Sequence, residues 1–131
     1  MPLMTNVGWI VDLDVQAEAT EIFHTLTLEM VADASKEPGC ITYQRFISSD
    51  HRIYRLLEVY TDCDAARLHL ANFRSKFGAQ FNALIHRRSF WAFGALDGYL
   101  TRELEAFGAQ FHPHIVGFSC RILGLPSEKG R

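Results

Sequence analysis

Cysteine and proline are scarce in this chain of 131 residues, and neither sign of charge dominates it. Its three cysteines, Cys40, Cys63 and Cys120, are odd in number, widely spaced and without a C-x-x-C pair. This excludes a disulfide framework and a thiolate metal site, so we expect thiols that pack as small apolar side chains. With 13 basic residues against 15 acidic ones and no basic run, nucleic acid is not an expected partner.

Long apolar runs are missing as well. No stretch of roughly 18 apolar residues is present, so no membrane-spanning helix is predicted and no membrane partner is expected. Residues 1–6 lack the basic segment and the continuous apolar stretch of a signal peptide, which predicts a cytoplasmic location. An apolar content of 48% is typical of a globular protein, and the length favours one domain that a partner subunit would help to stabilise.

Strand and helix patterns alternate along the chain. Pro38-Gly39 ends the first helix, because proline has no backbone N–H and glycine tolerates positive φ. Asp62 or Asp64 is a suitable N-cap for the second helix. The predicted strands are residues 7–13, 40–48, 52–61, 89–95 and 115–122, and the predicted helices are 16–36, 64–88 and a third marked by Leu100, Leu104, Phe107 and Phe111.

The third predicted strand decides the architecture, because it carries apolar side chains on both sides. These are Ile53, Leu57 and Val59 on one side, and Tyr54, Leu56 and Tyr60 on the other. Helices of the same chain can cover one face, but the second face needs another sheet. We therefore predict a homodimer that packs two sheets face to face.

The segment 96–123 contains the last predicted helix and strand. A unit of this size cannot bury enough area to fold alone, so we expect it to dock on the same sheet. The predicted organisation is one domain over residues 1–124, followed by a loose tail at 125–131.

Two motifs suggest a family. Glu37-Pro38-Gly39 leads into a strand, and Glu58-Val59-Tyr60 precedes a helix with His69 on its second turn. This outline resembles the antibiotic biosynthesis monooxygenase family over residues 5–85. The resemblance implies an α+β fold with a ferredoxin-like antiparallel sheet, helices on one face, and pairing of two subunits into a dimeric α/β barrel.

His69 is the first candidate for chemistry. It precedes Phe73 by one helical turn, where a side chain reaches the space between helix and sheet. It also follows Tyr60 by nine residues, the place where many family members carry a histidine. An imidazole titrates near neutral pH and is able to take a proton from a phenol. We predict a catalytic group of His69, Glu58 and Tyr60, while a helix-surface histidine bonded to a strand stays open as the alternative.

Glu58 shares its strand face with aromatic and aliphatic side chains, so a buried carboxylate there needs a partner. Structural pairing with Arg45, Arg55 or Arg67 is favoured over a catalytic role. Many family members have a second histidine after the first, where this chain has Arg74, which is suited to stabilise an anionic intermediate.

Aromatic and polar side chains around these groups are predicted to bind substrate. The predicted substrate-binding residues are Asn6, Trp9, Tyr43, Tyr54, Phe73, Arg74 and Phe77. A run of rings suits flat apolar ligands, although core packing is the more common use of such residues. This run is Phe73, Phe77, Phe81, Phe90, Trp91 and Phe93.

Metal and haem sites are not predicted. His112-Pro113-His114 has no nearby carboxylate and is a weak ligand set. Haem-degrading family members carry a tryptophan where this chain has His69 and a haem-ligating histidine where it has Ala79. Their chemistry is therefore not expected here.

The resemblance implies a cofactor-independent monooxygenase that acts on a small aromatic, polyketide-like or quinol-like molecule, with no flavin or metal. Its substrate anion would react with oxygen directly, and the protein would supply a base and a dry cavity. Two alternatives stay open. One is a non-catalytic dimeric protein that binds a small molecule or is associated with stress, and the other is a sugar isomerase of the same family.

Overall fold

A computed structural model describes residues 5–119 of the chain. Within this part, no helix is both long and apolar enough to cross a membrane. The elements are β1 (Val7–Val15), a short 3-10 helix η1 (Ala17–Ala19), α1 (Thr20–Ala34), β2 (Cys40–Ile47), β3 (Ile53–Tyr60), α2 (Cys63–Lys76), α3 (Gly78–Leu84), β4 (Ile85–Gly94), α4 (Gly98–Glu105) and β5 (Gln110–Pro113).

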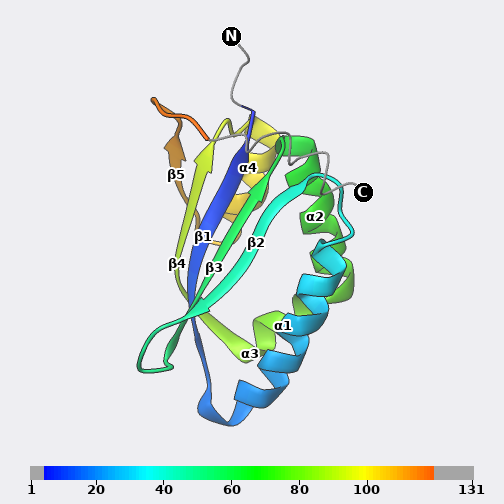
Figure 1. The fold of residues 1–131 in the computed structure, drawn as a ribbon, viewed down its shortest axis with the longest axis vertical. Coiled ribbons are helices and arrows are strands. Elements are labelled where there is room, and N and C mark those ends of the chain that lie inside the picture. The colour runs from blue at the N-terminus through cyan, green and yellow to red at the C-terminus, as the bar shows by residue number, and fades with distance from the viewer. Residues whose placement is uncertain (1–4, 120–131) are drawn as a thin grey trace.

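The strands form one sheet in the order β2-β3-β1-β4-β5. Strands β2, β3, β1 and β4 run antiparallel to one another in this order, whereas β5 runs parallel to β4. Figure 1 shows the α-helices together on one side of this sheet. The predicted α+β fold, a ferredoxin-like sheet with helices on one face, is confirmed.

The core lies between the sheet and the helices. Alternate residues of β1 point into it and are almost fully buried, namely Val7, Trp9, Val11 and Leu13. Helix α2 begins where the sequence predicts, because the Asp62 side chain accepts a hydrogen bond of 2.8 Å from the backbone N–H of Ala65. Cys40 is buried and Cys63 half-buried as thiols, while Cys120 lies outside the described residues.

The predicted helix over residues 64–88 is wrong in one respect, because the chain forms two helices and then enters β4 early. Phe77 has a φ of −129°, which breaks the helix between α2 and α3. Strand β4 then begins at Ile85, since β1 continues to Val15 and pairs with residues 85–87. Strand formation thus overrides the predicted helix end at Arg87, which pairs with Leu13, and at Arg88, which lies at a shift in the register.

The C-terminal unit docks on the same sheet, as expected, but with different bounds. Gly108 has a φ of +79°, so the chain turns after α4 and Phe111 lies in β5 instead of on the helix. The predicted strand at 115–122 is wrong over 115–119, where the residues form no strand and Ile115 is 91% exposed. Residues 120–122 and the predicted tail at 125–131 lie outside the described part of the chain.

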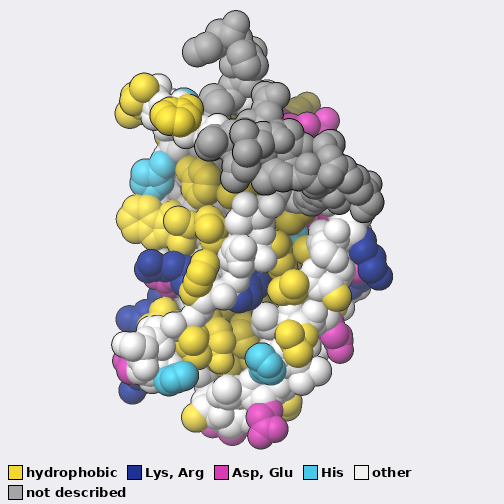
Figure 2. Space-filling model, viewed as in Figure 1, with side chains coloured by type: hydrophobic (Ala, Val, Ile, Leu, Met, Phe, Trp, Pro, Cys, Tyr) yellow, Lys and Arg dark blue, Asp and Glu magenta, His cyan; other side chains and the backbone are white. Residues whose placement is uncertain are grey.

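No helix within residues 5–119 covers the opposite face of the sheet. Ile10 lies between Leu57 on β3 and Trp91 on β4, and all three point away from the helices. Trp91 is 45% exposed, and Phe46 on β2 is 51% exposed. Figure 2 shows hydrophobic side chains over the strands, beside Lys and Arg side chains. The prediction that both sheet faces carry apolar residues is confirmed.

Candidate functional site

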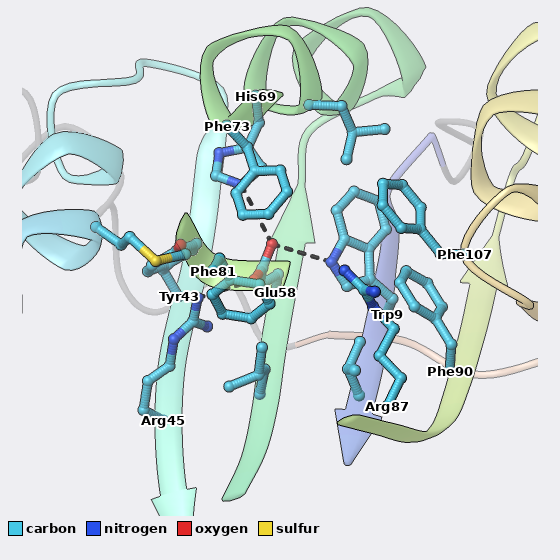
Figure 3. A pocket seen from close by; sticks show the side chains of 14 residues that line it. Trp9, Tyr43, Arg45, Glu58, His69, Phe73, Phe81, Arg87, Phe90 and Phe107 are labelled. Atoms are coloured by element: carbon cyan, nitrogen blue, oxygen red, sulfur yellow. Dashed lines mark hydrogen bonds and ion pairs between the residues drawn. The ribbon is translucent and has the colours of Figure 1, made fainter. Parts of the chain in front are cut away.

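A cavity of about 40 Å³ lies between the sheet and helices α2 and α3. It has room for a few water molecules, whereas pockets that enclose drug-sized ligands measure roughly 300–1,000 Å³. An aromatic ligand therefore requires neighbouring side chains to move. Five predicted site residues line the cavity, namely Trp9, Tyr43, Glu58, His69 and Phe73 (Figure 3).

Glu58 is the centre of the polar contacts. Its Oε1 accepts hydrogen bonds from Trp9 Nε1 at 3.0 Å and from the Tyr60 hydroxyl at 2.8 Å. Arg45 Nη2 lies 3.1 Å from Glu58 Oε2. The angles of this contact do not fit a hydrogen bond, so the contact is an ion pair. The Arg45 guanidinium also lies 3.9 Å above the Tyr43 ring. Glu58 is therefore a buried, charge-paired acceptor, as the favoured structural interpretation predicted, and Arg45 is its partner.

His69 lies between two carboxylates. Its Nδ1 is 2.9 Å from Glu37 Oε1, and its Nε2 is 3.4 Å from Glu58 Oε1. Asn72 Nδ2 donates to the other oxygen of Glu37 at 3.1 Å. The imidazole is buried and borders the cavity, so the alternative of a histidine on the helix surface is wrong.

Glu37 determines which nitrogen of His69 carries the proton in the neutral imidazole. An ionised carboxylate only accepts hydrogen bonds, so Glu37 favours a proton on Nδ1. In the neutral imidazole, Nε2 is then the proton acceptor. Burial raises the pKa of Glu37. The hydrogen bond and charge of His69, together with the hydrogen bond of Asn72, lower this pKa by a larger amount. The net pKa therefore lies below its usual value. Glu37 thus remains a carboxylate that holds the imidazole in place.

The tyrosines at the site are donors and not bases. Burial, followed by the charge of Glu58, raises the pKa of both Tyr43 and Tyr60 far above the usual phenol value. Both hydroxyls therefore stay protonated at neutral pH. Tyr60 is fully buried and donates to Glu58, so it supports that carboxylate and does not face a ligand directly.

Aromatic rings and a second arginine form the rest of the wall. Phe73 and Phe81 meet edge to face, with ring centres 5.3 Å apart. Phe90 and Phe107 stack at 5.8 Å with an angle of 9° between their planes. Arg87 extends from β4 along this wall toward the level of Trp9 (Figure 3).

Four predicted substrate-binding residues do not line this cavity. Tyr54 packs edge to face against Phe23, and Phe77 lies at the junction of α2 and α3. Arg74 forms a 2.9 Å ion pair with Glu103 on the exposed side of α2. Asn6 lies directly before β1, where its backbone carbonyl accepts a hydrogen bond from the Ala95 N–H.

Sequence reasoning missed Glu37, Arg87 and Phe107 as site residues, and it considered Arg45 only as a partner of Glu58. Arg45 follows Tyr43 by two residues on a strand, so the period of two places both on one face. Glu37 looked only like the end of a helix. No sequence pattern near Phe107 predicts its place at the cavity, because that place depends on how the C-terminal unit docks on the sheet.

Residues 7–83 match the model of the antibiotic biosynthesis monooxygenase family. No match is found among curated proteins.

Several solved structures share the fold at sequence identities below 25%. MupZ from Pseudomonas fluorescens is 20% identical with a TM-score of 0.79, and the match covers 89% of this chain and 96% of MupZ. SnoaB from Streptomyces nogalater, a cofactor-independent oxygenase, is 23% identical with a TM-score of 0.60, covering 71% of this chain and 95% of SnoaB. Rv0793 from Mycobacterium tuberculosis is 23% identical with a TM-score of 0.56, covering 71% and 97%. Since the family match spans more than half of the sequence, this chain belongs to the antibiotic biosynthesis monooxygenase family.

Proposed function

We propose that this protein is a cofactor-independent monooxygenase that oxidises a small aromatic or quinol-like molecule at the cavity beneath α2. The observation that carries the proposal is His69, a buried imidazole on the cavity wall whose Nδ1 is held by Glu37. Membership of the family and the likeness to SnoaB support the same class of reaction.

His69 acts as the general base in this proposal. A substrate hydroxyl or acidic C–H gives its proton to Nε2, while Glu37 keeps the Nδ1 proton in place. The new imidazolium is flanked by carboxylates on both sides, because Glu58 Oε1 lies 3.4 Å from Nε2. The two carboxylates stabilise the imidazolium, and the imidazolium in turn pairs with the substrate anion.

The substrate anion then supplies the electrons for oxygen reduction. Dioxygen adds to the electron-rich carbon, and the resulting hydroperoxide loses water to leave a carbonyl group. One oxygen atom remains in the product and the other leaves as water, so this route balances without an added reductant. The rings of Phe73, Phe81 and Phe90 exclude water from the reacting carbon.

Oxygen uptake with anthrones and naphthohydroquinones, in the absence of flavin and metal, tests the proposal. His69→Ala should reduce kcat/KM by about 10²–10⁴-fold, the range for loss of a general base. His24→Ala is the control, since His24 is exposed on α1. An unchanged rate in His69→Ala removes this residue from the mechanism, and activity that appears only with flavin contradicts the cofactor-free route.

A second candidate is a small-molecule-binding protein without catalysis. The observation that favours it is the small cavity, which side chains largely fill. Binding of aromatic ligands with no oxygen uptake by any of them would support this alternative.

We also infer a homodimer that pairs the uncovered sheet faces. Ile10, Leu57 and Trp91 are apolar neighbours on this face, and no helix of the described chain covers them. Exposed apolar area costs roughly 25 cal/mol per Å², so pairing two such faces stabilises both subunits.

A further inference from the structure

We propose that Arg87 is a specificity residue that selects an aromatic substrate carrying a carboxylate group. The proposal deepens the proposed function, because it concerns the ligand of the same cavity. It makes a separate prediction about binding, which is measured without turnover.

Arg87 differs from the other arginine of the cavity in its partners. Arg45 is paired with Glu58 at 3.1 Å. Among the described residues, Arg87 has no carboxylate partner, and its only hydrogen bond runs from Nη2 to the neutral amide oxygen of Asn82 at 2.9 Å. Its other contacts are with rings, since the guanidinium carbon lies 4.8 Å from the centre of Phe107 and 5.9 Å from that of Phe81.

No acidic side chain of the described residues therefore balances the positive charge of Arg87. Arg87 is half-buried, and this burial lowers the pKa of its guanidinium, although the group stays charged at neutral pH. A partly desolvated cation gains more from an opposite charge than one in open water. The planar fork of a guanidinium matches a carboxylate in a two-bond arrangement.

The charges of the cavity also fix the orientation of such a ligand. Glu37 and Glu58 carry negative charge around His69, so a carboxylate is repelled from that end. It is attracted to Arg87, beside the stacked rings of Phe90 and Phe107. The phenol or C–H to be deprotonated then faces His69, and the aromatic ring spans the apolar wall between the two ends (Figure 3).

The residues at the Arg87 end belong to the part of the chain beyond the family match. That match stops at residue 83, whereas Arg87, Phe90 and Phe107 follow it. Phe107 comes from the C-terminal unit that docks beside β4. The family match therefore does not extend to the residues of the carboxylate site.

The experiment compares two stable ligands by calorimetric titration at pH 7 and fixed salt. These are 6-hydroxy-2-naphthoate, whose carboxylate and hydroxyl lie at opposite ends of the ring system, and 2-naphthol, which has no carboxylate. The wild type should bind the acid more tightly by about 10- to 100-fold, the range for hydrogen bonds to a charged group. Arg87→Gln should lose this preference, and Arg87→Lys should keep part of it.

The matched control is Arg88→Gln. Arg88 is adjacent in sequence, is paired with Asp14 at 3.0 Å, and lies with Asp12 and Arg55 on the other side of the sheet. It should leave the preference unchanged, and thermal unfolding of each variant checks that the fold is intact.

The outcomes separate this proposal from the proposed function. Equal or weaker binding of the acid by the wild type, including no binding at all, overturns the role of Arg87, as does a preference retained in Arg87→Gln. Preferential binding of the acid without oxygen uptake by any substrate supports the carboxylate site and contradicts the oxygenase. Oxygen uptake with no preference for acids supports the oxygenase and contradicts the carboxylate site.

Discussion

Removing the charge of Glu58 should destabilise the fold strongly, even when its hydrogen-bond acceptor is kept. Glu58→Gln retains an amide oxygen for Trp9 and Tyr60 but cannot balance the charge of Arg45, whose side chain is only 11% exposed. Breaking a buried ion pair by removing one partner costs roughly 3–5 kcal/mol. The Tyr43 ring 3.9 Å below the guanidinium still contacts that charge in the variant, which favours the lower end of this range. We therefore expect a loss of about 3 kcal/mol in the free energy of unfolding.

Urea denaturation of four proteins measures this effect. They are the wild type, Glu58→Gln, Arg45→Met and the double variant. Because the double variant leaves no buried charge unpaired, it should cost about 2 kcal/mol less than the sum of the single variants.

Asp12→Asn is the control, since Asp12 pairs with Arg55 at 2.7 Å but the Arg55 side chain is 60% exposed. Such exposed pairs contribute less than about 1 kcal/mol. A Glu58→Gln variant that loses no more stability than this control would refute the reasoning, and so would strictly additive effects in the double variant.

Three further predictions concern the site, the dimer and the C-terminal unit. The folded-state pKa of Glu37 is lowered, so its ionised form adds stability at pH values above the ordinary pKa of 4.5, and this stability is lost as pH falls through the folded-state pKa. Glu37→Gln should therefore lower the free energy of unfolding at pH 7. Urea titrations at several pH values should also show a smaller loss of stability between pH 7 and pH 3 in this variant. The wild type should sediment as a dimer at micromolar concentration and Trp91→Glu as a folded monomer, whereas a wild-type monomer would contradict the pairing of sheet faces. Truncation after Ala95 removes Leu100 and Leu104, which are fully buried, and should give an insoluble or molten chain; a soluble fragment with cooperative unfolding would show that the unit is an accessory.

The first three strands were predictable because their signals are local. The alternation in β1 and the Pro38-Gly39 break need no knowledge of distant residues. The later bounds depend on contacts between distant segments. Ile85 joins a strand because β1 extends to Val15, and Phe111 leaves the predicted helix because Gly108 turns the chain.

The same distinction applies to the site. His69 and Glu58 were predictable as candidates from their spacing and from their apolar neighbours. That they lie 3.4 Å apart depends on the packing of α2 across β3. The partner on the other nitrogen, Glu37, comes from the turn after α1, 32 residues away in sequence. No pattern within one element links these two groups, so the environment of the imidazole had to come from the tertiary structure.

The two arginines at the cavity show how such an environment separates support from recognition. Arg45 and Arg87 are equivalent as residue types, and both lie on strands beside aromatic rings. Arg45 is neutralised by Glu58, and its loss is expected to appear in stability. Arg87 has only a neutral amide partner within the described chain, so its loss should appear in ligand binding instead. Which of the two measurements changes is therefore a direct test of whether the charge at each position serves the fold or the substrate.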